Sequence, residues 1–155
     1  MNWFQKLLSN PFLLIGLSSW FWAQLIKTII HAIVTKSIDF TRLIGDGGMP
    51  SGHSATVCAM VVATGRYCGV NSPLFAIAAV LSIIVMYDAM GVRYETGEQA
   101  KVLNRMFTEW MDQGFEQFQL PHGKKLKEMV GHTPLQVVAG FLVGLVVGLL
   151  YPLGL

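Results

Sequence analysis

The chain has 155 residues, a length that suits a single domain. Apolar side chains make up 53% of it and charged ones only 13%, roughly half the charged share that is usual in soluble proteins. A soluble protein this short could not hide that much apolar surface, and a net charge of +2 is too small to indicate a nucleic-acid partner.

Four apolar segments follow one another along the chain. Three of them reach the length of about 20 residues that a bilayer requires: residues 11–34, 73–92 and 134–153. Residues 54–70 are shorter and contain Arg66, so this segment is the weakest candidate for a span. The sequence therefore predicts an all-α integral membrane protein, with one domain over residues 1–155, about four transmembrane helices and the lipid bilayer as its surroundings. Residues 1–10 contain no apolar core, so no cleaved signal peptide is expected.

The segment from residue 95 to residue 120 is too polar to be a span. Its larger apolar residues recur at roughly helical spacing: Leu103, Met106, Phe107, Trp110, Phe115 and Phe118. This pattern predicts an amphipathic helix at the membrane interface, with Trp110 at the depth of the lipid headgroups. A helix that packs on the rest of the protein in water is the alternative.

Four spans would bring three polar segments to one face of the membrane. The glycine-rich loop before residue 54, the end of the third span near Arg93 and the start of the fourth span near His132 all lie on that face. Most lysines and arginines outside the spans lie there too. The positive-inside rule then predicts that this face is cytoplasmic and that both termini are outside.

The glycine-rich loop has the composition of an anion-binding turn. It reads GGMPSGHSAT over residues 47–56. Gly47 and Gly48 allow the backbone N–H groups to turn inward, as only residues without a side chain readily do. Ser51 is a natural N-cap, so the following helix would direct its positive end at a ligand beside His53.

The last span begins in a similar way. Residues 131–134 read Gly-His-Thr-Pro, where Thr133 can cap the helix and Pro134 can occupy its first turn. A second helix N-terminus would therefore open toward the same place, beside His132. Such a site favours phosphate or diphosphate.

Three blocks of sequence carry a family resemblance: GGMPSGHSA, DAMGVRYETGEQAKVLN and GHTPLQVVAG. In this order they resemble the small divergent branch of the type 2 phosphatidic acid phosphatase superfamily, which also contains the vanadium haloperoxidases, over residues 24–144. The resemblance implies a reduced version of that helical bundle. It also implies a metal-independent phosphatase that acts on a lipid or isoprenoid phosphate and needs no cofactor.

The resemblance assigns the chemistry to two histidines. His53 matches the histidine that protonates the leaving group, and His132 matches the one that attacks phosphorus to form a phosphohistidine. The superfamily's usual pattern has Ser-Arg six residues before the nucleophile and Asp four residues after it, where this chain has Leu126 and Gln136. Arg93 could supply the missing guanidinium. Gln136 could orient the imidazole but could not stabilise its charge as a carboxylate would.

The predicted site contains further residues from each segment. The superfamily's lysine followed by Arg-Pro is absent as written, and Lys27 and Arg42 are the nearest matches. Lys27 lies inside the first span, where a charge is costly. It therefore either binds the anion or pairs with an acid such as Asp88. The predicted phosphate-binding residues are Lys27, Arg42, Gly48, Ser51, Gly52 and Arg93, and the predicted supporting residues are Asp88, Gln99, Asn104 and Gln136.

Other interpretations stay open at this point. Asp46 and Asp88 could hold Mg²⁺ beside a phosphate, but no acids at metal-ligand spacing accompany them, so no metal is predicted. A protein that binds or carries anionic lipid headgroups without catalysis would explain the departures from the family pattern. Gly140, Gly144 and Gly148 form a small-residue face that packs helices within or between protomers, or belongs to an oligomeric transporter. Because four spans are few to enclose a site, a homodimer is a further alternative.

Overall fold

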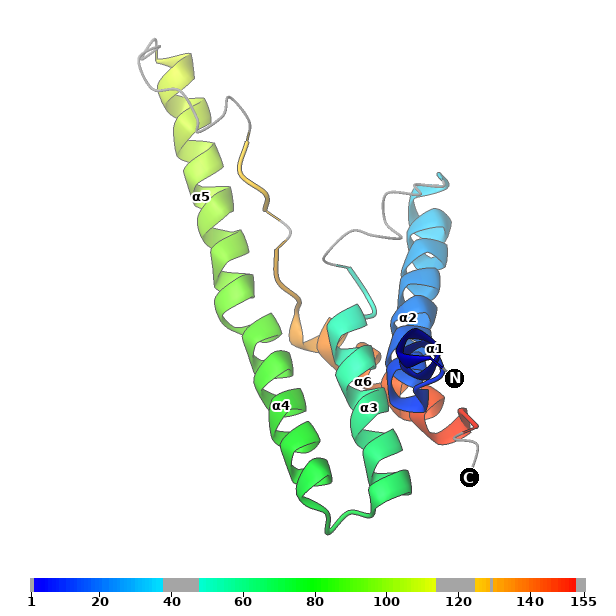
Figure 1. The fold of residues 1–155 in the computed structure, drawn as a ribbon. Coiled ribbons are helices and arrows are strands. Elements are labelled where there is room, and N and C mark those ends of the chain that lie inside the picture. The colour runs from blue at the N-terminus through cyan, green and yellow to red at the C-terminus, as the bar shows by residue number, and fades with distance from the viewer. Residues whose placement is uncertain (1, 38–47, 114–124, 129, 153–155) are drawn as a thin grey trace.

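The computed structural model describes residues 2–37, 48–113, 125–128 and 130–152 (Figure 1). In these ranges the chain forms six helices and no strand. The helices are α1 (Trp3–Leu8), α2 (Pro11–Thr35), α3 (Gly52–Cys68), α4 (Pro73–Met90), α5 (Val92–Asp112) and α6 (Pro134–Leu150). Two helical stretches, Pro11–Thr35 and Pro73–Asp112, are long and apolar enough to cross a membrane, and α6 is apolar but shorter. The predicted class, an all-α membrane protein, is confirmed, whereas the count of four spans stays a prediction.

The apolar helices begin where a polar cap precedes a proline. The Asn10, Ser72 and Thr133 side chains accept hydrogen bonds from the first free backbone N–H groups of α2, α4 and α6. A proline follows each of these caps at the first helical position, where its missing N–H costs nothing. These local signals explain why the predicted starts of the three helices are correct.

Two of the predicted segments end later than the helices do. α4 ends at Met90 instead of residue 92, because Gly91 leaves the helical conformation. α6 ends at Leu150 instead of residue 153, because Tyr151 is extended (φ −65°, ψ 128°), as a residue before proline prefers. The second predicted span, 54–70, corresponds to α3 shifted by two residues.

Helix α3 is the centre of the bundle and contacts α2, α4 and α6. The residues that α3 buries are small, which lets the neighbouring helices approach closely: Gly52, Ser54, Ala55, Cys58, Ala59, Ala63 and Thr64. The glycine face of α6 packs against α3. A Cβ atom at Gly144 would lie 2.4 Å from the carbonyl oxygen of Ala55. The glycine face therefore packs helices within the chain.

Arg66, the charged residue of the weakest predicted span, lies near the end of α3. Its Nη1 donates hydrogen bonds to the carbonyl oxygens of Gly148 at 2.7 Å and Tyr151 at 3.0 Å. These acceptors lie at the C-terminal end of α6, where a cation also complements the helix dipole. Arg66 thus joins α3 to α6 at the end opposite the glycine-rich loop.

Helices α4 and α5 form a long arm beside the bundle. Figure 1 shows α5 continuing from α4 with a slight bend and extending away from the other helices. The amphipathic helix predicted over 95–120 is found as Val92–Asp112, and residues 114–120 lie outside the described ranges. Its buried residues are Gly97, Ala100 and Asn104. Its position relative to the bilayer stays a prediction.

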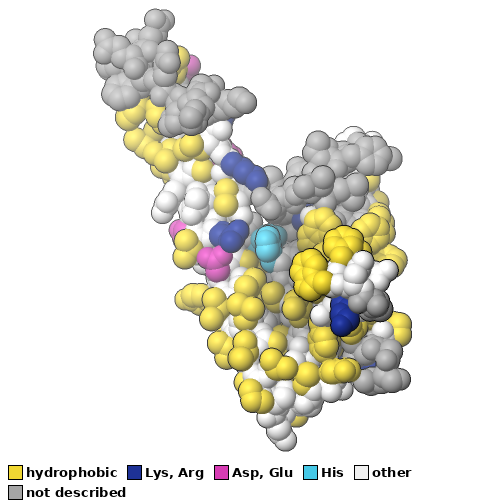
Figure 2. Space-filling model, viewed as in Figure 1, with side chains coloured by type: hydrophobic (Ala, Val, Ile, Leu, Met, Phe, Trp, Pro, Cys, Tyr) yellow, Lys and Arg dark blue, Asp and Glu magenta, His cyan; other side chains and the backbone are white. Residues whose placement is uncertain are grey.

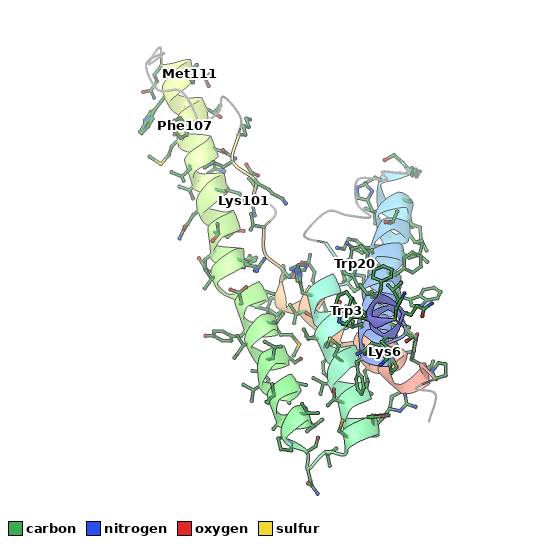
Figure 3. All side chains as sticks on the ribbon, in the orientation of Figure 1. Trp3, Lys6, Trp20, Lys101, Phe107 and Met111 are labelled. Atoms are coloured by element: carbon green, nitrogen blue, oxygen red, sulfur yellow. The ribbon has the colours of Figure 1, made fainter. Side chains whose placement is uncertain are left out.

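Much of the apolar surface of the arm is exposed. Figure 3 labels Phe107 and Met111 near the far end of α5, and Met111 is 51% exposed. The exposed large apolar residues of α4 include Leu74, Ile77, Ile83 and Ile84. Helices with this much apolar surface are expected in lipid, where such surface needs no protein cover.

Candidate functional site

Residues 48–51 of the glycine-rich loop lead into α3 and make a hydrogen bond to the first turn of α6. The fully buried Ser51 caps α3, with its Oγ accepting a hydrogen bond from the backbone N–H of Ser54 at 3.4 Å. The Ser51 backbone N–H donates to the carbonyl oxygen of Gln136 at 2.9 Å. Gly48 has φ +85°, in the left-handed region that glycine adopts without strain. The capped helix N-terminus predicted before His53 is therefore present.

Helix α2 presents one polar face to this loop. Lys27 is only 5% exposed, and its Cγ and Cδ atoms lie 3.4 Å from the position of a Cβ at Gly48. One turn earlier, Gln24 is 4% exposed, and its Cδ lies 4.0 Å from the corresponding position at Gly52. The Trp20 ring approaches the same position to 3.2 Å, and Figure 3 labels this residue on α2. The face formed by Trp20, Gln24 and Lys27 thus lines the loop.

Gln24 and Trp20 were not among the residues predicted from the sequence. The signal for them was their spacing, because residues 20, 24 and 27 share one face of a helix. Glutamine carries no charge, so its presence in an apolar segment indicates a ligand less strongly than the charge of Lys27 does.

The structure brings together the two predicted histidines. The ring centroids of His53 and His132 are 6.1 Å apart, with an angle of 80° between the ring planes. His53, on the first turn of α3, is exposed, whereas His132, two residues before α6, is 2% exposed. On the face drawn in Figure 2, histidine surface lies between the arm and the bundle, with Lys and Arg side chains beside it on the arm.

The junction between α4 and α5 holds the His132 backbone in place. The His132 N–H donates a hydrogen bond to the carbonyl oxygen of Ala89 at 3.0 Å. A Cβ atom at Gly131 would lie 2.2 Å from the backbone nitrogen of Tyr94 and 2.6 Å from the carbonyl carbon of Arg93. Because that space is already filled by backbone, only glycine allows the chain to pass here into α6.

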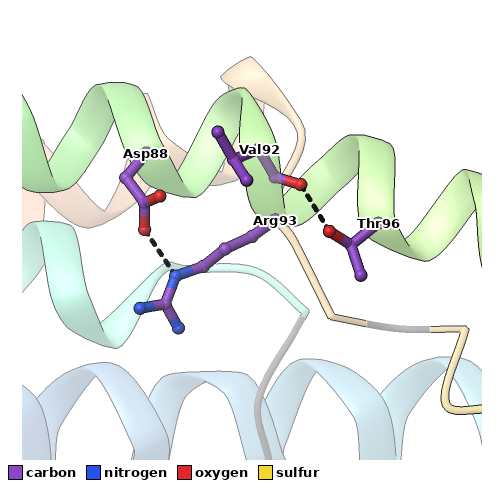
Figure 4. A network of polar contacts seen from close by, with 4 residues as sticks. All are labelled: Asp88, Val92, Arg93 and Thr96. Atoms are coloured by element: carbon purple, nitrogen blue, oxygen red, sulfur yellow. Dashed lines mark hydrogen bonds and ion pairs between the residues drawn. The ribbon is translucent and has the colours of Figure 1, made fainter.

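Arg93 forms an ion pair at this junction. Its Nε donates to Asp88 Oδ2 at 2.5 Å, and the two side chains are 52% and 41% exposed (Figure 4). Figure 4 also shows the two terminal guanidinium nitrogens directed away from Asp88. The acid considered as a partner for Lys27 is thus the partner of Arg93. An exposed pair of this kind contributes little stability, so a ligand anion could readily share the guanidinium.

Asn104, predicted to support the site, clamps the segment that leads to His132. Its Nδ2 donates to the carbonyl oxygen of Leu126 at 2.9 Å and to Glu128 Oε1 at 2.8 Å. Its Oδ1 accepts a hydrogen bond from the Leu126 N–H at 2.9 Å. Nearby, a Cβ atom at Gly97 would lie 2.4 Å from the carbonyl oxygen of Glu128. Residues 125–128 therefore lie directly on α5, held by a buried amide.

Replacing Asn104 by alanine is expected to release this segment. The change removes both amide–backbone hydrogen bonds of Leu126, so hydrogen exchange of the Leu126 N–H should accelerate at least tenfold. Exchange measured by mass spectrometry on the detergent-purified protein checks the prediction. Thr108→Ala, one turn along α5, is the control. Unchanged exchange at Leu126 in the Asn104 variant would contradict the clamp.

Two other predicted supporting residues have different surroundings. Gln136 forms a capping box with Thr133: its Oε1 accepts from the Thr133 N–H at 3.1 Å, and its own N–H donates to Thr133 Oγ1 at 3.4 Å. Gln99 is exposed on α5, and no hydrogen bond within the described part of the chain joins it to the site. An orienting role of Gln136 toward His132 stays a prediction.

Some of the predicted residues fall outside the described ranges. These are Arg42, predicted to bind phosphate, and Asp46, considered as a metal ligand. Among the side chains that the structure does describe, no three His, Cys, Asp or Glu residues gather as metal ligands. The described site therefore consists of a helix N-terminus, a glycine turn, two histidines and the cations Lys27 and Arg93.

Comparisons with known proteins place this chain among membrane proteins. A family model described as the divergent PAP2 family matches residues 8–147. The chain is similar to the uncharacterized membrane protein YuiD of Bacillus subtilis (strain 168), with 39% identity over 150 residues, which is 93% of this chain and 95% of that protein. No solved structure matches it. The match spans all the elements that build the site, and this all-α membrane protein belongs to the divergent PAP2 family.

Proposed function

We propose that the protein is a membrane-embedded phosphatase that hydrolyses a lipid or isoprenoid phosphate or diphosphate through a histidine nucleophile. The observation that carries the proposal is the approach of His53 and His132, whose ring centroids are 6.1 Å apart beside the capped N-terminus of α3. The two rings come from segments that are distant in the sequence. Their meeting brings two imidazoles to an anion-binding turn, as acid–base chemistry on a phosphate requires.

The reaction has two steps. A nitrogen of His132 attacks phosphorus, the bond from phosphorus to the leaving oxygen breaks, and His53 donates a proton to that oxygen. Water then attacks the phosphohistidine with His53 as base, which releases phosphate and restores both rings. Reacting groups in such steps approach to about 3 Å, so the proposal requires a nitrogen of each ring to be directed at the bound phosphoryl group.

The surroundings favour the negative charge of the substrate. The N-terminal turn of α3 offers free N–H groups and a partial positive charge. Lys27 lies against Gly48, and the exposed Arg93 guanidinium lies at the junction that holds His132. Arg42, which lies outside the described residues, is proposed as a further phosphate ligand. These groups supply the charge-assisted hydrogen bonds that phosphoryl oxygens require.

The test is phosphate release by the detergent-purified protein from a panel of lipid phosphates and isoprenoid diphosphates, without added metal. His53→Ala and His132→Ala should each lower release at least 100-fold, because each removes a reacting group. His31→Ala changes a histidine on α2 outside the site and should leave the rate unchanged. Normal turnover by the His132 variant would show that the nucleophile is assigned wrongly. The panel also separates monophosphates from diphosphates.

A second candidate is binding of anionic lipid headgroups without catalysis. It is favoured by Leu126, which stands where the superfamily has arginine, and by Gln136, whose Oε1 is engaged in the cap of α6. A folded protein that binds vanadate or lipid phosphate but releases no phosphate from the whole panel would support this candidate. We further propose that the protein lies in the cytoplasmic membrane of a bacterium, as its similarity to a Bacillus membrane protein supports, that its site faces the cytoplasm, and that it forms a homodimer.

A further inference from the structure

We infer that Gln24 is a ligand contact of the phosphate site, where its amide hydrogen-bonds a phosphoryl oxygen of the bound substrate. The inference rests on the proposed function for the class of its ligand. Gln24 lies within α2, is 4% exposed, and faces the first residue of α3 with its Cδ 4.0 Å from the position of a Cβ at Gly52. Neither the resemblance nor the comparisons assign this residue a role.

The amide carbonyl of Gln24 has no hydrogen-bond partner among the residues that the structure describes. Its Oε1 is buried, and no donor reaches it within the part of the chain that the structure describes. Burying a polar atom without a hydrogen bond is unfavourable, so such atoms are rare and a functional site is one explanation for them. A glutamine in an apolar helix carries this cost where leucine would avoid it.

The position of Gln24 indicates what its partner is. It lies one turn from Lys27, which lies against Gly48, and both side chains face the loop that caps α3. Three kinds of group therefore border the start of α3: the free N–H groups of its first turn, the side chain of a lysine and a carboxamide. The first two attract anions. The carboxamide can accept from a protonated phosphoryl oxygen and donate to an ionised one, so it complements a phosphate group in either orientation.

A second buried polar group near this turn, the hydroxyl of Ser54, faces a different helix. Ser54 Oγ is also buried without a partner among the described residues, but the Ser54 Cβ lies 3.0 Å from the position of a Cβ at Gly140. It therefore lies in the contact between α3 and α6. Of these two side chains, Gln24 is the one that shares the loop-facing side of α2 with Lys27.

The experiment compares stability and ligand binding in full-length Gln24→Met. Methionine fills a similar volume and removes the unpaired carbonyl, so without ligand the melting temperature in detergent should stay unchanged or rise by about 2–4 °C. Affinity for orthovanadate should fall at least tenfold, because a hydrogen bond to a charged ligand is lost. Gln24→Glu keeps the shape but adds a repelling charge, and should weaken vanadate binding at least 100-fold. Gln113→Met, an exposed change at the end of α5, should alter neither quantity.

Opposite results overturn the inference. If Gln24→Met lowers the melting temperature and leaves vanadate affinity unchanged, Gln24 is a structural residue. If Gln24→Met does not fold, Gln24→Glu decides, and wild-type affinity in that variant rejects the contact. Phosphate release is followed separately. Wild-type protein that binds vanadate but hydrolyses nothing contradicts the phosphatase, while the affinities of the variants still decide the role of Gln24.

Discussion

His53→Ala and His132→Ala are expected to differ most on substrates with different leaving groups. A general acid accelerates a reaction about 10²–10⁴-fold where the leaving oxygen needs a proton, as the alkoxide of a lipid phosphate does. The leaving group of p-nitrophenyl phosphate is stable as an anion and needs no such help. The His53 variant should therefore lose about 10²–10⁴-fold in kcat/KM on a lipid phosphate, but less than about tenfold on p-nitrophenyl phosphate.

His132→Ala should lose at least 10³-fold in kcat/KM on both substrates, because no leaving group replaces a nucleophile. Steady-state kinetics on the two substrates measure the difference, and acid-quenched samples are examined for acid-labile phosphoprotein. His53→Ala should accumulate phosphohistidine from p-nitrophenyl phosphate, since the hydrolysis step has lost its base. His132→Ala should form none. The opposite pattern would assign the nucleophile to His53, which is the more exposed of the two rings.

The parts of the fold that follow from local chemistry could be predicted from the sequence. The starts of α4 and α6 were predictable because Ser72 and Thr133 cap helices whose first residue is proline. The approach of His53 and His132 was predictable in outline, because the four predicted spans would place both residues at the same face of the membrane. Neither inference required knowledge of the packing between distant residues.

The contacts that shape the site depend on distant packing and were not predictable. Nothing in the local sequence indicates that Asn104 binds the backbone of residue 126 or that Gln24 faces Gly52. Arg93 was predicted to bind phosphate, and its ion pair with Asp88 across the turn at Gly91 was not foreseen. Polar side chains in apolar helices find partners that helical periodicity does not specify.

Gly144→Ala is expected to have the largest effect on stability among single changes outside the site. The added methyl group would lie 2.4 Å from the carbonyl oxygen of Ala55 and 2.7 Å from the Cβ of Cys58. The first is a backbone atom of α3, and the second is a Cβ atom, which is fixed by the backbone. Because no side-chain rotation can move either atom, the two helices must separate. Overpacking of this kind costs about 3 kcal/mol. Thermal unfolding in detergent should show a clearly lower melting temperature.

Gly16→Ala is the matched control, because it makes the same change at a buried glycine of a neighbouring helix. Its methyl group would meet the flexible end of Met60, with Cγ at 3.3 Å and Sδ at 3.4 Å. That side chain can move, and alanine is favoured over glycine in a helix by roughly 0.5–1 kcal/mol, so the melting temperature should stay level or rise. Equal losses of melting temperature in both variants would contradict the close backbone contact between α3 and α6 at Gly144.

The Gly144 variant also tests the proposed function. Helix α3 carries His53, and His132 lies two residues before α6. Separating these helices should therefore lower phosphate release although both histidines remain in the chain.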